Sequence, residues 1–148
     1  MSGSLKKLYQ EVILDHSRHP RNFGTMAKPD KSASGNNPLC GDKVTVFLTI
    51  EGDNILDTSF DARGCAISIA SASMMTEMVK GKSIEQAKTL YEKFTAIVTG
   101  QTGPSGELAD LETLSGVKDF PTRIKCATLS WHAMSAALDN SDKEVKTE

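Results

Sequence analysis

Apolar residues recur at helical spacing in four segments of the chain. Ser83 begins the third segment within a Ser-Ile-Glu-Gln capping box, and Pro121 precedes the last segment. Gly81 and Gly100 stand where a left-handed residue typically ends a helix. The sequence therefore predicts helices from about residue 4 to 16, from just after 65 to 81, from 83 to 100 and from 121 to 138, with a shorter one over 108–114.

Each predicted helix has an apolar stripe that we expect to face the core. The methionines of the second stripe are typical of core filler at this spacing, although Met also occurs at soft-metal and promiscuous binding surfaces. The stripes comprise Leu5, Leu8, Val12 and Ile13 in the first helix; Ile67, Ala70, Ser71, Met74, Met75 and Met78 in the second; Ile84, Ala87, Tyr91, Phe94 and Val98 in the third; and Ile124, Ala127, Trp131, Met134 and Leu138 in the last.

Alternating apolar and polar residues predict a strand over 44–50, and a turn at 51–54 joins it to a second strand over 55–61. Residues 25–37 are small and polar, which is compatible only with a weak edge strand. We therefore expect an α+β fold in which helices pack on one face of a small antiparallel three-stranded sheet. The 148 residues indicate a single domain over 1–148, with an ordered core at about 5–138 and a frayed charged tail over 140–148.

The charge balance excludes the usual basis for binding nucleic acid or an anionic membrane. The chain carries 17 basic and 19 acidic side chains, a formal net charge of −2. Its apolar stretches are too short to span a bilayer, and its first residues lack the apolar block of a signal peptide. We expect a cytoplasmic protein with no nucleic-acid or membrane partner.

Three cysteines, far apart in the sequence, are the main candidates for chemistry. An odd number of cysteines in a reducing compartment argues against disulfides, which leaves buried structural thiols as the simplest alternative. Cys40 lies in a loop before the first clear strand, and Cys65 lies at the junction of a strand and a helix. Cys126 lies in the first turns of the last helix, about 120° from its apolar stripe. Cys65 and Cys126 are thus near helix N-termini, which favour thiolates.

Asp42 is the natural fourth member of this group, because a single glycine separates it from Cys40. Three thiolates and one carboxylate form a donor set that suits tetrahedral Zn²⁺. Such a site has a net negative charge, so we expect a nearby cation, and Arg123 lies three residues before Cys126. The alternative is that Asp42 is an ordinary loop acid and Arg123 an ordinary base at a helix start.

The histidines are weaker candidates. His132 lies about 120° around its helix from Cys126, which disfavours a shared metal. His16 and His19 flank the end of the first helix, where histidine commonly interacts with the helix C-terminus. A hydrolytic cysteine–histidine pair is therefore poorly supported.

These cysteine segments resemble the three signature blocks of the NifU/IscU scaffold family. The blocks read NNPLCGD over 36–42, GCAISIASASMM over 64–75 and RIKCATLSW over 123–131, and DHSRHPRNFG over 15–24 resembles the family's N-terminal block. Lys125 stands where the iron–sulfur scaffold branch has a histidine, and 99–118 resembles the extra segment of the SufU branch. The SufU branch is therefore the closer likeness.

The resemblance implies Zn²⁺ held by Cys40, Asp42, Cys65 and Cys126. It also implies a sulfurtransferase that accepts persulfide sulfur from a SufS-type cysteine desulfurase, for transfer toward downstream iron–sulfur assembly proteins. Cys40 is then the sulfur acceptor, since it lies on a loop beside Gly41, with Arg123 in a supporting role. Two alternatives stay open: a scaffold that assembles an iron–sulfur cluster on the same three cysteines, and a structural zinc module that docks partners.

Overall fold

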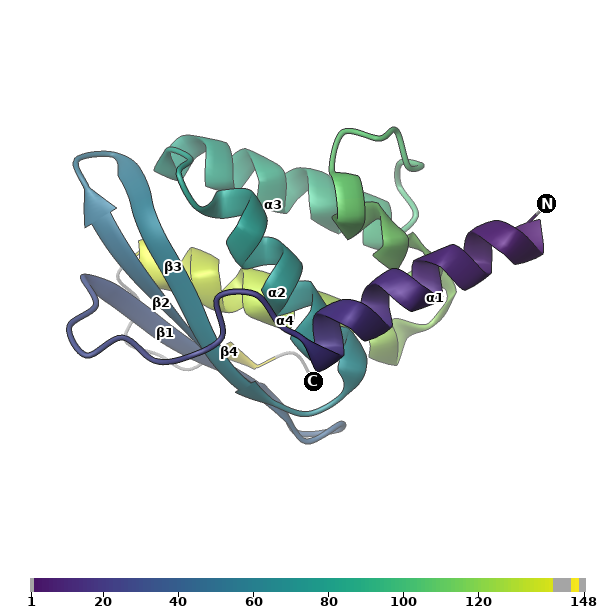
Figure 1. The fold of residues 1–148 in the computed structure, drawn as a ribbon, viewed down its shortest axis with the longest axis horizontal. Coiled ribbons are helices and arrows are strands. Elements are labelled where there is room, and N and C mark those ends of the chain that lie inside the picture. Colours follow the sequence, from purple (N-terminus) through teal and green to yellow (C-terminus); the bar gives the residue numbers. More distant parts are fainter. Residues whose placement is uncertain (1, 140–144, 147–148) are drawn as a thin grey trace.

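The computed structural model describes residues 2–139 and 145–146, which form one sheet and a layer of helices (Figure 1). The elements in chain order are α1 (Ser2–Arg18), β1 (Lys31–Asn37), β2 (Asp42–Glu51), β3 (Asn54–Arg63), α2 (Ala66–Val79), α3 (Ile84–Val98), the 3₁₀ helix η1 (Ala109–Asp119), α4 (Pro121–Leu138) and β4 (Val145–Lys146).

The strands are ordered β3-β2-β1-β4 in the sheet. β2 pairs antiparallel with both β1 and β3, and the two-residue β4 pairs parallel with β1. The helices lie on one face of this sheet, so the predicted α+β class and the three antiparallel strands are confirmed. The predicted frayed tail lies mostly outside the described residues.

β1 is a seven-residue strand, although its sequence predicted only a weak edge strand. Its inward residues Ala33, Gly35 and Asn37 are buried beneath α4. On α4, Cys126 shares a face with small residues, and its contact with Asn37 places that face on β1. Small side chains on both elements allow the close approach, and tertiary packing thereby overrides weak strand propensity.

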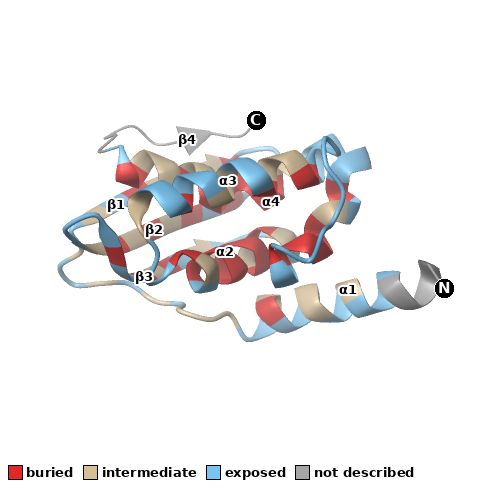
Figure 2. Cartoon of the chain, turned by 90° about the horizontal axis from the view of Figure 1, so that it is seen from above, coloured by how far each residue is buried: buried red, intermediate tan, exposed pale blue. Residues whose placement is uncertain are grey.

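α2 is buried on nearly all sides rather than along one stripe (Figure 2). The predicted stripe lies in or against the core, but α2 packs against α1, α4 and β3 at once, so burial extends beyond that stripe. Met74 and Met75 are in the core, as expected, but Ser71 and Ser73 are also fully buried. Their hydroxyls find partners, because Ser71 Oγ donates to the Ala127 carbonyl oxygen at 2.5 Å and Ser73 Oγ contacts His16.

His16 is buried and connects α1 to two other elements. Its Nδ1 lies 2.8 Å from Ser73 Oγ on α2, and its Nε2 lies 3.2 Å from Asp110 Oδ2 on η1. His16 lies in the last turn of α1, as expected, and its two ring nitrogens contact α2 and η1. The predicted α1 stripe is only partly correct, because Leu8 is 53% exposed.

The segment that leads into α4 differs in part from the prediction. The capping box of Ser83 and Gln86 is present at the start of α3. η1 is a 3₁₀ helix that reaches Asp119, well beyond the short helix predicted over 108–114, and it passes directly into α4 through Phe120. Trp131 anchors α4 in the core by stacking on Phe94, with ring centroids 5.1 Å apart. No helix in the described part of the chain has the length and apolar character needed to cross a membrane.

Candidate metal centre

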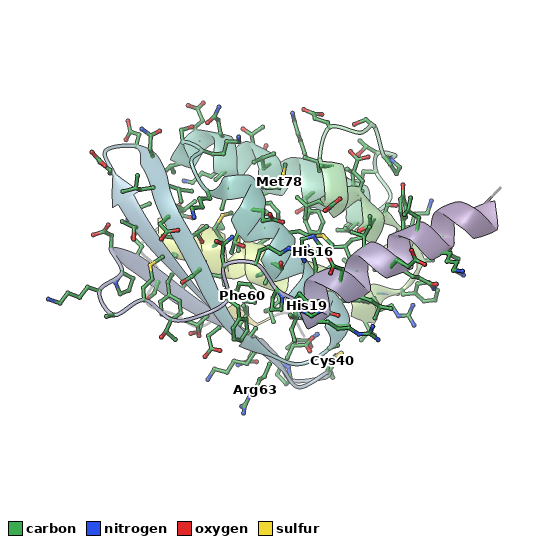
Figure 3. All side chains as sticks on the ribbon, viewed as in Figure 1. His16, His19, Cys40, Phe60, Arg63 and Met78 are labelled. Carbon is green, nitrogen blue, oxygen red and sulfur yellow. The ribbon has the colours of Figure 1, made fainter. Side chains whose placement is uncertain are left out.

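The three cysteines come together because three elements end at the same place. Asn37 pairs with Asp42 across the β1–β2 hairpin, so Cys40 lies in the short turn between them. Arg63, the last residue of β3, pairs with Lys43, which brings the β3–α2 junction beside Asp42. Figure 3 shows Cys40 and Arg63 at the same end of the molecule.

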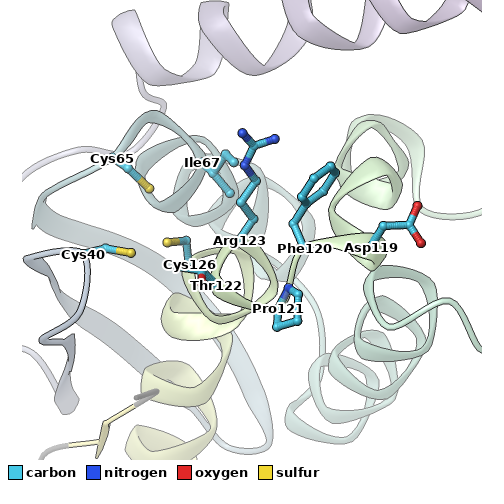
Figure 4. A pocket seen from close by; sticks show the side chains of 9 residues that line it. All are labelled: Cys40, Cys65, Ile67, Asp119, Phe120, Pro121, Thr122, Arg123 and Cys126. Carbon is cyan, nitrogen blue, oxygen red and sulfur yellow. The ribbon is translucent and has the colours of Figure 1, made fainter.

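All four residues of the predicted ligand set lie near one another. One potential ligand atom each from Cys40, Asp42 and Cys126 lies within 4.8 Å of the other two. The Cys65 Sγ atom lies 3.7 Å from Asp42 Oδ2. Figure 4 shows the sulfur atoms of the three cysteines pointing toward one another. Among the described residues, the group within this mutual distance comprises Cys40, Asp42 and Cys126, and Cys65 lies beside it through its contact with Asp42.

The Asp42 carboxylate is buried, with 1% of the residue exposed. Its Oδ1 accepts a hydrogen bond from the Cys65 N–H at 2.8 Å, and its Oδ2 accepts the Cys65 thiol at 3.7 Å. Among residues 2–139 and 145–146, no lysine or arginine forms an ion pair with Asp42. A buried carboxylate without a cation is costly, and thiols are the ligands that Zn²⁺ prefers. This donor set therefore fits a bound Zn²⁺.

Gly64 makes room for the Asp42 carboxylate. A Cβ atom at position 64 would lie 2.1 Å from Asp42 Oδ1 and 2.8 Å from Asp42 Cα. The φ angle of Gly64 is +135°, a conformation that other residues rarely adopt. Position 64 therefore requires glycine for both space and backbone conformation.

The thiols of Cys65 and Cys126 are electrostatically distinct. A hydrogen bond with the Cys126 thiol, aided by backbone N–H groups at the start of α2, lowers the pKa of Cys65 to about 7. Burial and the Asp42 carboxylate oppose this effect. The same hydrogen bond, together with burial, raises the pKa of the Cys126 thiol. In the metal-free protein, Cys65 is therefore the first of these two thiols to ionise.

An open cavity of about 440 Å³ leads from the surface to the thiols. All three cysteines line it, and so do Phe120 and Arg123 at the start of α4 (Figure 4). The Arg123 guanidinium lies over the Phe120 ring, 4.6 Å from its centroid, and points away from the thiols. The structure thus places Arg123 at the cavity but not against the sulfur atoms.

The histidines do not join this cluster. His132 Nδ1 is hydrogen-bonded to the Tyr91 hydroxyl on α3, and burial lowers the pKa of His132. His16 contacts Ser73 and Asp110, as described above. Within the described residues, the group with metal-ligand spacing contains no histidine.

The roles of Asn37, Gly64 and Phe120 at this site could not be predicted from the sequence. Asn37 is fully buried and donates from Nδ2 to Cys126 Sγ at 3.7 Å. Phe120 is 48% exposed and supports Arg123 at the cavity. The only sequence signals were a polar residue at an inward strand position and a glycine directly before a cysteine, and both signals are common without function.

A family profile described as the NifU-like N-terminal domain matches residues 8–146. The chain is 44% identical over 138 residues to the zinc-dependent sulfurtransferase SufU of Bacillus subtilis, covering 93% of each protein. It is 43% identical over 140 residues to the iron–sulfur cluster assembly scaffold protein IscU of Streptococcus pyogenes, covering 94% of this chain and 87% of that protein.

A solved structure supports the same grouping. It is described as an iron–sulfur cluster assembly scaffold protein for the SUF system from Fervidobacterium islandicum. The two chains superpose with a TM-score of 0.81 at 31% identity, over 89% of this chain and 97% of that one. The resemblance read from the cysteine blocks is therefore confirmed.

Replacing Gly64 by alanine tests its role as the space for Asp42. We expect Gly64→Ala to lower the free energy of unfolding by about 3 kcal/mol, because backbone strain and a clash with Asp42 add together. Gly52→Ala is the matched control, since its φ is +62° but nothing lies within 4 Å of its added Cβ. It should cost only about 1 kcal/mol in denaturant unfolding. Equal losses would contradict the assignment.

The pKa of Cys65 predicts a pH-dependent reactivity. In the metal-free, reduced protein, alkylation of Cys65 should rise with pH around a midpoint of about 7, below the ordinary thiol value of 9.0, because the thiolate is the nucleophile. Cys126→Ala removes the largest cause of the shift, so it should move the midpoint upward. Peptide mapping by mass spectrometry at a series of pH values provides the measurement. A wild-type midpoint near 9 would refute this account of the thiol pair.

Proposed function

We infer the function of this chain from its family, because it belongs to the proteins with a NifU-like N-terminal domain, a family of iron–sulfur cluster assembly proteins. We propose that it is a zinc-dependent sulfurtransferase. In this role it accepts persulfide sulfur from a pyridoxal-phosphate cysteine desulfurase of the SufS type and delivers it to downstream iron–sulfur assembly proteins. The observation that carries this proposal is the grouping of Cys40, Asp42 and Cys126 at metal-ligand spacing, with the Cys65 thiol in contact with the Asp42 carboxylate.

Cys40, Asp42, Cys65 and Cys126 would hold the zinc. When bound, Zn²⁺ keeps its sulfur ligands deprotonated at neutral pH and provides a cationic partner for the Asp42 carboxylate. The chain contributes a fixed frame: the Cys65 N–H orients Asp42, and Gly64 makes room for it. Because these ligands come from separate elements, we expect zinc binding to stabilise the end of the fold where they meet.

Cys40 is the best placed of the three thiols to accept sulfur. It is partly exposed and lies in a turn beside Gly41, whose φ is +71°, whereas Cys126 is buried in a helix. Cys65 is also partly exposed, but it caps α2 and its sulfur accepts the Ser68 N–H. In the transfer step, the Cys40 thiolate attacks the terminal sulfur of the partner's cysteine persulfide. A new S–S bond forms at Cys40 Sγ as the S–S bond in the partner breaks, and the partner's cysteine leaves as a thiolate. The reaction needs no added oxidant or reductant.

Arg123 would support this step through its charge. It lies at the cavity that leads to Cys40, where a positive side chain attracts an anionic persulfide. The cation–π contact with the Phe120 ring holds the Arg123 guanidinium at the cavity. This position suits attraction of the incoming group better than contact with the bound metal.

The second candidate is a scaffold that assembles an iron–sulfur cluster on the same three cysteines. The name of the Streptococcus relative favours it, whereas the Fervidobacterium structure is described both as a scaffold protein and as a SufU. Lys125 counts against it, because it stands where the resemblance places a histidine in the scaffold branch. Zinc content, visible absorbance after reconstitution with iron and sulfide, and stimulation of a desulfurase separate the two functions.

Replacing the proposed acceptor tests the sulfur-transfer step. With a SufS-type desulfurase and cysteine, the zinc-loaded wild type should increase desulfurase turnover, and mass spectrometry should find the added sulfur on Cys40. Cys40→Ser should reduce the stimulation by more than about tenfold, because a hydroxyl cannot carry a persulfide. Ser105→Ala, in an exposed loop away from the thiols, is the control and should behave like the wild type. Persulfide found only on Cys126, or full stimulation by Cys40→Ser, would overturn the assignment.

A further inference from the structure

Asn37 contacts two of the proposed ligand residues and pairs with a third, although it is not itself a proposed ligand. Its side-chain Nδ2 donates to Cys126 Sγ at 3.7 Å, and its backbone carbonyl accepts from the Cys40 N–H at 3.2 Å. It is also the cross-strand partner of Asp42 in the β1–β2 hairpin. One buried residue thus connects the turn that holds Cys40 to the helix that holds Cys126.

N–H donors are distributed unequally over the three sulfur atoms. Cys65 Sγ accepts from the Ser68 N–H at 3.4 Å, and Cys126 Sγ accepts from Asn37. In the described part of the chain, no N–H group donates to Cys40 Sγ. An N–H donor stabilises the negative charge of a thiolate and thereby lowers its tendency to attack an electrophile. Within the described residues, Cys40 is therefore the sulfur of these three without an N–H donor.

The side-chain oxygen of Asn37 indicates the role of its amide group. Its Oδ1 is buried and has no hydrogen-bond partner within the described residues. An unpaired buried carbonyl oxygen is destabilising, and an apolar side chain of similar size would avoid that cost. Since the backbone alone makes the contact with Cys40, the N–H contact with Cys126 is the interaction that only the amide supplies.

We propose that Asn37 is a positioning residue that decides which thiolate accepts sulfur. Its amide lowers the nucleophilicity of Cys126, and its carbonyl holds the turn that carries Cys40, whose sulfur has no such donor within the described residues. This inference rests on the proposed function, because it assigns a cause to the choice of Cys40. It concerns the relative nucleophilicity of two thiolates and not their affinity for a partner protein.

The test compares alkylation of Cys40 and Cys126 in the protein loaded with zinc alone. Limiting iodoacetamide followed by peptide mapping gives the ratio of the two modified cysteines. The wild type should react mainly at Cys40. Asn37→Leu should raise the share on Cys126 by about tenfold, the factor that loss of one hydrogen bond to a charged group carries. Thr58→Val is the matched control, since it also removes a buried, unpartnered polar atom of the sheet, on β3. It should leave the ratio unchanged.

A spectroscopic measurement separates this role from a structural one. In the cobalt(II)-substituted protein, Asn37→Leu should shift the thiolate-to-metal charge-transfer band to lower energy, because the sulfur lone pair loses its N–H donor. Thr58→Val should not move the band. If Asn37→Leu does not fold, Asn37→Ser replaces it, because its side chain is too short to replace the contact with Cys126.

An unchanged alkylation ratio and an unmoved cobalt band in a folded Asn37 variant would overturn the inference. Neither measurement uses a desulfurase, so its outcome is independent of sulfur transfer. If the wild type fails to stimulate a desulfurase but the Asn37 variant shows the expected shift, only the proposed function is lost.

Discussion

The hydrogen bond from the Cys65 N–H to the buried Asp42 carboxylate joins the two parts of the chain on which the site depends. It fixes the start of α2 against the start of β2, and the Asn37–Asp42 pair then places the Cys40 turn beside both. The carboxylate approaches so closely only because Gly64 has no side chain. A buried carboxylate held in this way, without a paired lysine or arginine in the described residues, would be stabilised by a bound cation. The site is thus organised around a carboxylate with which none of the described lysines or arginines forms an ion pair.

The main elements of the fold could be predicted from the sequence because their signals are local. The capping box at Ser83 and the alternation over 44–50 appear in the structure as predicted. β1 was underestimated because its burial depends on α4, which lies far along the chain. The full burial of α2 could not be predicted for the same reason, since Ser71 and Ser73 are accommodated in the interior by hydrogen bonds to α4 and α1.

In the candidate site, too, some residues could be predicted from local sequence signals and others depend on tertiary contacts. The three cysteines could be grouped from the sequence alone, because they lie at element boundaries and Asp42 lies close to Cys40. Arg123 was expected beside the thiols, but it stacks on Phe120 instead. This contact depends on the path of η1, whose length was underestimated from the sequence. Asn37 and Gly64 were missed because their importance comes from what lies opposite them. The residues around the ligands thus depend on tertiary contacts, whereas the ligands themselves carry a chemical signature.

The proposed sulfurtransferase and scaffold functions use the same three cysteines, so the fold alone does not test the account. The number and kind of ligands at the bound metal test it more directly. X-ray absorption at the zinc edge of the purified protein measures them most directly. Our account predicts one zinc per chain with three sulfur neighbours at about 2.3 Å and one oxygen neighbour at about 2.0 Å. In Asp42→Ala the oxygen of that side chain should be lost while the three sulfurs remain. A protein without zinc, or a zinc with fewer than three sulfur neighbours, would contradict the central claim.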